Sequence, residues 1–193
     1  MNTLTFLIVL IILLIVIIGG SYALLYNGLV RTRQKVKEAW SGIDVQLKRR
    51  YDLIPNLVNA VKGYAAHEKS TLENVVKART DAISVPEGKI AQQAKAENEL
   101  SGTLKSIFAL AENYPDLKAN QNFLELQTQL AETEDQIAAS RRIYNGNVTD
   151  LNTKVESFPS NFVANLHKFE KAEFFELDES EKEAVKKTPE VRF

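Results

Sequence analysis

Few side chains in this sequence are of the kinds that carry enzyme chemistry. The chain has two histidines, His67 and His167, and no cysteine. The lack of cysteine excludes disulfides, thiolate metal ligands and cysteine nucleophiles. His67-Glu68 begins like the helical motif of zinc proteases, but Thr71 stands where that motif needs its second histidine. We therefore interpret His67 as a surface or helix-capping residue, and the sequence predicts no catalytic residue, no bound metal and no cofactor.

Lys48, Arg49 and Arg50 form a basic cluster that is a candidate partner surface. Asp44 and Asp52 each lie four residues from Lys48. Helical i,i+4 ion pairs, each contributing about 0.2–0.5 kcal/mol, would make the cluster an ordinary solvated face, and we favour that interpretation. An upright helix would place the cluster about 35 Å from a membrane, and charges are screened over about 8 Å, so we expect no lipid contact. The net charge of −1 indicates no nucleic-acid partner.

These residues follow an apolar segment that is long enough to cross a membrane. Residues 1–30 carry no charged side chain, and Leu4–Leu25 consists mainly of Leu, Ile and Val. As a helix this segment spans about 33 Å, and the hydrocarbon core of a bilayer is about 30 Å thick. A cleaved signal peptide would need a basic residue before a shorter apolar core, and no Lys or Arg precedes Phe6. We predict a permanent transmembrane helix over residues 4–25, with the lipid bilayer as its partner.

The charges around this helix predict its orientation. No Lys or Arg precedes it, whereas Arg31, Arg33, Lys35 and Lys37 follow it closely. Basic residues near the ends of a span are retained on the cytoplasmic side. We therefore expect a single-pass protein with residues 1–3 on the extracytoplasmic side of the membrane and the domain after the span in the cytoplasm.

Beyond the span, apolar residues recur at intervals of three and four, which is typical of amphipathic helices. Helices are expected from about Val36 to Val61, from Glu68 to Ile83, from Lys89 to Asn113 and from Phe123 to Val155. Their predicted apolar faces are Val36, Trp40, Ile43, Leu47, Ile54, Leu57 and Val61; Leu72, Val75, Val76 and Ile83; Ile90, Ala94, Leu104, Phe108 and Ala111; and Phe123, Leu126, Leu130, Ile137, Tyr144, Val148, Leu151 and Val155. Short connections between such helices predict an all-α fold, an antiparallel up-and-down helical bundle that follows the transmembrane helix.

Pro55 lies inside the first amphipathic helix. Proline removes one backbone hydrogen bond and disfavours helical geometry at the preceding residue. We therefore expect a kink or a break between Tyr51 and Pro55, and the carbonyl of Tyr51 then needs a new partner. Arg49 or Arg50 should turn toward carboxylates of the long fourth helix. The carboxylates available there are Glu125, Glu132, Glu134 and Asp135.

The domain organisation follows from these elements. We assign residues 26–158 to the bundle domain and residues 159–193 to a C-terminal tail. The tail is rich in phenylalanine and ends in a charged stretch, Asp178–Lys187, that we expect to be mobile. Its aromatic side chains need burial, so part of the tail should pack on the bundle. These side chains are Phe162, Phe169, Phe174 and Phe175.

Several short motifs are more specific than the helical pattern. They are Trp40–Val58 (WSGIDVQLKRRYDLIPNLV), Lys62-Gly63-Tyr64-Ala65 with His67-Glu68, Tyr114-Pro115-Asp116-Leu117-Lys118, Arg141-Arg142 with Tyr144-Asn145, and Phe158-Pro159-Ser160-Asn161. Together they resemble the LemA family of bacterial membrane-anchored proteins, from about Tyr26 to the C-terminus. Leu151 stands where that family often has tyrosine, and Lys168 where glycine is common. The resemblance implies a helical bundle on the cytoplasmic side of the bacterial inner membrane, and it implies no activity.

Two classes of function remain open from the sequence. A non-enzymatic scaffold or adaptor would present its helical surface to protein partners, or to copies of itself, near the inner membrane. An enzyme with an unrecognised active site is the alternative. The scarcity of histidine and the lack of cysteine favour the scaffold. A deep cleft with convergent polar groups would instead favour the enzyme.

Overall fold

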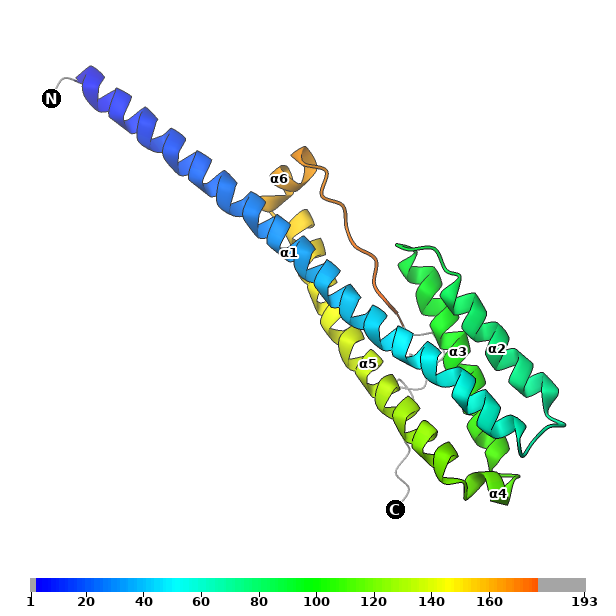
Figure 1. Ribbon diagram of the computed structural model, residues 1–193. Helices are drawn as coiled ribbons and strands as arrows, with labels where there is room; N and C mark the ends of the chain where they lie inside the picture. The colour runs from blue at the N-terminus through cyan, green and yellow to red at the C-terminus, as the bar shows by residue number, and fades with distance from the viewer. Residues whose placement is uncertain (1–2, 177–193) are drawn as a thin grey trace, which may run out of the picture. The chain divides into compact units, whose positions relative to one another are not determined.

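The computed structural model describes residues 3–176, and within them the regular secondary structure is helical, with no strand. The helices are α1 (Thr3–Lys62), α2 (Lys69–Ile83), α3 (Ile90–Ala111), α4 (Pro115–Lys118), α5 (Gln121–Glu156) and α6 (Ser160–Leu166), as Figure 1 shows. The predicted all-α fold is confirmed, with one long apolar helix followed by amphipathic helices.

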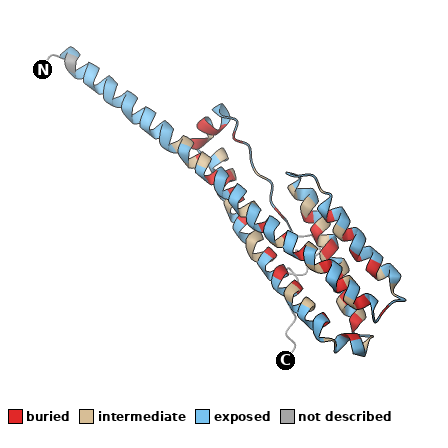
Figure 2. Ribbon diagram, in the orientation of Figure 1, coloured by how far each residue is buried: buried red, intermediate tan, exposed pale blue. Residues whose placement is uncertain are grey.

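Helix α1 is a single helix of 60 residues. It runs through Pro55 without a break, so the split that we considered there does not occur, and it ends immediately before Gly63. Its N-terminal part is long and apolar enough to cross a membrane. The apolar side chains of that part are exposed around the whole helix, as lipid-facing side chains must be (Figure 2).

The described residues form two compact units. One contains residues 3–40 and 143–172, and the other contains residues 41–142 and 173–176. We call them the anchor unit and the bundle unit. Helices α1 and α5 contribute to both units, so the predicted bundle domain, residues 26–158, includes parts of each.

The bundle unit is built from the end of α1, the helices α2, α3 and α4, and the first part of α5. Its long helical segments run up and down beside one another, because each short connection reverses the chain (Figure 1). Its main core consists of Ile54, Leu57, Val61, Ala65, Leu72, Val75, Ala78, Ala82, Leu100, Leu104, Ile107, Ala111, Leu117, Phe123 and Leu130. This bundle confirms the predicted architecture.

The prediction was wrong for two residues of α2. Val76 and Ile83 are exposed, whereas Ala78 and Ala82 are buried. The inward face of α2 continues from Val75 through these alanines at helical intervals. Alanine side chains let the neighbouring helices approach closely, and a search for large apolar residues does not detect such a face.

The anchor unit joins α1 to the last part of α5 and to α6. The Lys154 ammonium donates to the Thr32 hydroxyl over 2.5 Å, which ties α5 to α1. The extended segment after α6 is fixed to α5 by Asn152, whose amide donates to the carbonyl of Ala172 over 3.1 Å and accepts from its N–H over 2.9 Å. The small core of this unit consists of Leu29, Val163, Ala164 and Phe169.

The predicted tail therefore contains a helix and packs in part on the rest of the protein. Among its aromatic residues, Phe169 and Phe175 are buried as expected, but Phe162 and Phe174 are exposed. The predicted mobility of Asp178–Lys187 concerns residues outside the described part of the chain.

Helix α6 ends in a backbone arrangement that favours glycine. Lys168 has a φ of +53°, the left-handed conformation. The N–H of Phe169 donates to the carbonyl of Ala164 over 2.9 Å, and the N–H of Lys168 donates to the carbonyl of Asn165 over 3.3 Å. These two bonds define a Schellman motif, in which the left-handed position is usually glycine. This geometry explains why a glycine at position 168, as is common in the family that the sequence resembles, would suit the fold.

We expect Lys168→Gly to raise the free energy of unfolding of the anchor unit by about 1 kcal/mol. The left-handed conformation costs an L-residue about 1–2 kcal/mol, and the greater freedom of glycine in the unfolded chain offsets part of the gain. Urea denaturation followed by the fluorescence of Trp40, the single tryptophan, measures the change in this unit. Lys168→Ala removes the charge but keeps the Cβ, so it should give no gain. Equal stabilisation by both variants would contradict the backbone explanation.

Candidate functional site

The bundle unit contains a buried ionic cluster centred on Arg50. The apolar face of α1 is interrupted at this residue, and the Arg50 side chain is only 1% exposed. Its guanidinium donates to Glu97 and Ser101 of α3 and to Glu134 of α5. The distances to the Ser101 hydroxyl and to the Glu134 carboxylate are 2.9 and 2.5 Å. One arginine therefore links three helices of the bundle.

Glu97 is the second centre of this cluster. It is buried, and it accepts hydrogen bonds from Arg50, from the Tyr51 hydroxyl and from the Gln93 amide, the last over 2.7 Å. The Gln93 amide also donates to the carbonyl of Ala82 over 3.2 Å, which adds α2 to the network. Burial raises the pKa of Tyr51, and the adjacent Glu97 carboxylate raises it further. Tyr51 thus remains a neutral hydrogen-bond donor over the physiological pH range.

The sequence pattern missed Glu97, although a signal was present. Glu97 occupies the buried face of α3 between Ala94 and Leu100, three residues from each. A carboxylate at such a position needs a buried cationic partner, because an isolated buried charge is very costly. The interruption of the apolar face of α1 at Arg50 was the matching signal.

The basic cluster of α1 separates into buried and exposed parts. Arg50 is buried, whereas Lys48 and Arg49 are exposed. Arg49 lies 4.0 Å from Glu132, and both side chains are largely solvated. The expectation that an arginine turns toward a carboxylate of the long helix is confirmed by Arg50 and Glu134. Of the three residues in the candidate partner surface, only Lys48 and Arg49 are therefore available to a partner of the folded protein.

Pro55 leaves the backbone carbonyl of Tyr51 in need of a new hydrogen-bond donor, as expected. It cannot donate to the carbonyl of Tyr51, one turn earlier, and the Arg79 Nε of α2 donates to this carbonyl instead, over 2.8 Å. Arg79 therefore supplies the hydrogen bond that the proline removes, and it fixes α2 against α1 at this level.

We expect Arg79→Met to lower the free energy of unfolding by about 1–2 kcal/mol, because it leaves the Tyr51 carbonyl without its donor. In a Pro55→Ala background the alanine N–H can reach that carbonyl, and the same substitution should cost about 1 kcal/mol less. Urea denaturation followed by circular dichroism gives all four free energies. Equal costs in the two backgrounds would show that Arg79 acts independently of Pro55.

The His67-Glu68 pair, which begins like a zinc-protease motif, does not form a metal site in the structure. His67 is exposed, and Glu68 accepts a hydrogen bond from the Tyr114 hydroxyl over 3.1 Å. The pKa of Tyr114 is raised by burial and by this carboxylate. Among the described residues, no group of three or more His, Asp or Glu side chains is placed to hold a metal ion.

An open groove of about 480 Å³ lies between the end of α1 and α2. It is lined by Val58, Lys62, Ala66, Lys69, Leu72, Glu73, Val76 and Lys77. Valine, leucine and alanine side chains provide its apolar surface, and three lysines and one glutamate provide its polar groups. A smaller groove of about 310 Å³ in the anchor unit is lined by Arg33, Val36, Lys37, Leu151 and residues 168–172. The residues of the ionic cluster line neither groove.

Comparison with known proteins places the sequence in a family. A sequence model of the LemA family matches residues 39–193, most of the chain. The chain belongs to the LemA family. This LemA-family protein is 30% identical to Protein LemA of Metamycoplasma hominis over 158 residues, which cover 81% of this chain and 71% of that protein. Family membership and the long apolar helix together fit a membrane-anchored protein.

More distant relatives carry a different name. Magnetosome protein MamQ 2 of Paramagnetospirillum magneticum is 25% identical over 175 residues. Magnetosome protein MamQ of Magnetospirillum gryphiswaldense is 23% identical over 174 residues. In both comparisons the alignment covers 78% of this chain but only 64% of the relative, so the chain spans slightly less than two thirds of the length of the MamQ proteins.

Proposed function

We propose that this LemA-family protein is a non-enzymatic scaffold, anchored in the cytoplasmic membrane with its N-terminus outside and its helical bundle in the cytoplasm. The observation that carries the proposal is the contrast between two sites. The buried ionic cluster, which has the polar groups of an active site, is engaged in joining four helices. The accessible groove is lined by apolar side chains and by more lysines than carboxylates, which suits a protein ligand.

The chemistry of the groove indicates what kind of segment it binds. Val58, Leu72 and Val76 offer an apolar strip, and grooves of this kind accept the apolar face of an amphipathic helix. Three lysines and a single glutamate in the lining favour a helix with acidic flanks. The partner is then an acidic amphipathic segment of another protein or of a second copy of this chain. Lys48 and Arg49 provide a second exposed basic contact on α1.

The names of the relatives agree with this proposal. Their names, Protein LemA and Magnetosome protein MamQ, refer to no catalysed reaction. The alternative, an enzyme with an unrecognised site, would require polar groups that converge in an accessible cleft. The polar lining of the α1–α2 groove instead consists of three lysines and one glutamate, with no histidine.

The orientation is tested by reporters fused after Phe193. No basic residue precedes the span, and four basic residues follow it at positions 31–37. This distribution predicts a cytoplasmic C-terminus. We expect alkaline phosphatase, which is active only outside the cytoplasm, to be silent at this position, and green fluorescent protein to fluoresce. The reverse pattern would overturn the orientation.

The partner-binding role is tested by a photo-crosslinking amino acid at Val76, in the groove, in the full chain in living cells. Val45 is the matched control, because it is also an exposed valine but lies on α1 outside the groove. We expect one defined crosslinked protein from position 76 and none from position 45, and Lys62→Glu with Lys69→Glu should abolish it. Equal capture at both positions, or none at position 76, would overturn the proposal that the groove binds a partner. A dimer as the product would identify self-association.

A further inference from the structure

Helix α6 and the turn before it carry apolar side chains that no other part of residues 3–176 covers. Phe158, Phe162 and Leu166 are 79%, 68% and 70% exposed. Phe162 and Leu166 are four residues apart and share one side of α6, and Phe158 lies in the turn before the helix. The rings of Phe158 and Phe162 are in edge contact, with centroids 5.9 Å apart. Exposed apolar side chains gathered in this way mark a contact surface.

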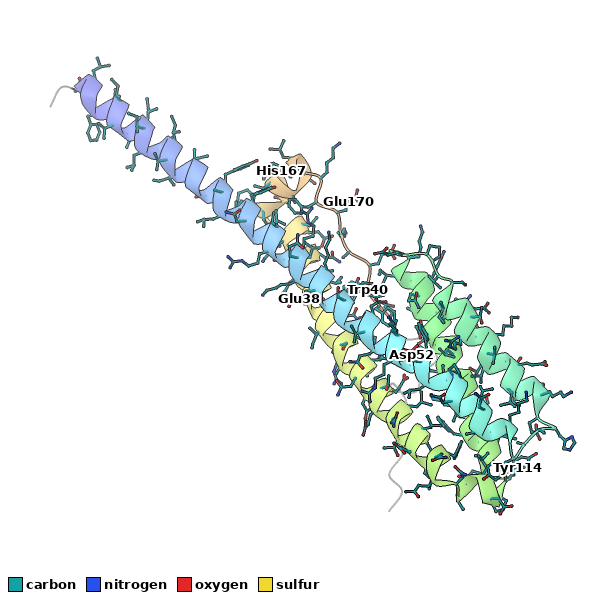
Figure 3. All side chains as sticks on the ribbon, viewed as in Figure 1. Glu38, Trp40, Asp52, Tyr114, His167 and Glu170 are labelled. Carbon is teal, nitrogen blue, oxygen red and sulfur yellow. The ribbon has the colours of Figure 1, made fainter. Side chains whose placement is uncertain are left out.

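The opposite side of α6 is attached to α1 at the end of the transmembrane segment. Val163 and Ala164 are buried in the core of the anchor unit, against which Leu25 and Tyr26 of α1 pack. His167 follows α6, and its Nε2 lies 2.5 Å from the Tyr22 hydroxyl. Helix α6 therefore lies beside the last turn of the apolar segment, as Figure 3 shows for His167.

This position corresponds to the boundary between the membrane and water. The ring of Tyr26 packs on His167, with centroids 4.7 Å apart, and tyrosine is enriched at this boundary in membrane proteins. The first charged residues of α1, Arg31 and Arg33, follow within two turns. The Arg33 guanidinium lies 4.8 Å from the centroid of the Phe169 ring. Apolar, aromatic and basic side chains therefore succeed one another along α1 in the order expected from the acyl chains to the headgroups.

We propose that the apolar face of α6 enters the membrane at the boundary between headgroups and acyl chains, beside the transmembrane helix. Because α6 packs beside the end of the apolar segment of α1, a bilayer and not a protein is the occupant of this face. The arginines on the water side suit anionic headgroups. Contact at a second point holds the anchor unit at a fixed depth and rotation. This inference rests on α1 crossing the membrane and is independent of the proposed scaffold role.

The cysteine-free sequence makes a direct test possible. Phe162→Cys in the full chain is labelled with a nitroxide and reconstituted into vesicles of three parts phosphatidylcholine to one part phosphatidylglycerol. Power-saturation electron paramagnetic resonance then compares the collision of the label with oxygen, which enters lipid, and with a nickel chelate, which remains in water. We expect position 162 to show high oxygen and low nickel accessibility, at a depth just below the phosphate groups.

Two matched positions calibrate this measurement. Ile15→Cys, in the apolar segment, gives the value for lipid. Ile143→Cys, an exposed isoleucine of α5 in the same unit, gives the value for water. If position 162 resembles position 143, the face is solvated and the proposal is wrong. Low accessibility to both reagents would show that protein covers the face, which would also overturn it. Neither outcome affects the crosslinking expected at Val76.

Discussion

Arg50→Met is expected to lower the free energy of unfolding of the bundle unit by about 3–5 kcal/mol, the usual cost of removing one partner from a buried ion pair. The substitution keeps much of the side-chain volume but leaves the buried Glu97 without its cation. It also removes the bonds that join α1 to Ser101 of α3 and to Glu134 of α5. Urea denaturation of the full chain in detergent micelles, followed by circular dichroism, measures the loss.

The neighbouring arginine provides the control for this prediction. Arg49→Met removes the same group one residue earlier, but that guanidinium is solvated and lies 4.0 Å from a solvated carboxylate. We expect a change of at most about 1 kcal/mol, as for exposed ion pairs in general. In a chain that also carries Glu97→Met, Arg50→Met should cost less, because the unpaired carboxylate is then absent. Similar losses for Arg49→Met and Arg50→Met would show that the ion pair with Glu97 is not what the bundle needs.

The sequence predicted those features of the fold that depend on large apolar residues at helical intervals. The apolar segment and the long helices were both found in this way. Glu97 and Arg79 were missed because their partners come from other helices, and a periodic pattern contains no information about which helices are neighbours. The buried alanines of α2 were missed because a close approach of helices depends on small side chains, which a hydrophobicity pattern counts weakly.

The division into an anchor unit and a bundle unit was not predicted either. Domain boundaries are usually recognised in linkers rich in proline, glycine or polar residues. Here the units share the uninterrupted helices α1 and α5, and the seven-residue repeat of α5 passes from Ile137 to Tyr144 across the boundary. The exposed face of α6 was unexpected for a different reason. The sequence indicated that Phe162 needs an apolar environment, and we assumed that the protein core would supply it.

Ile137→Ala is expected to lower the free energy of unfolding by about 2–5 kcal/mol, the range for truncating a buried branched side chain. Ile137 is buried on α5, seven residues after the equally buried Leu130. The loss combines the removed apolar surface with the cavity that remains, since closely packed helices relax only in part. Ile143→Ala makes the same chemical change on the same helix at a residue that is 63% exposed. Because that side chain is largely solvated, its truncation should change stability by no more than about 0.5 kcal/mol.

Denaturation curves of the two variants, measured side by side in micelles, therefore test directly which face of α5 is turned inward. If Ile137→Ala costs less than Ile143→Ala, the inward face of the longest amphipathic helix has been misplaced.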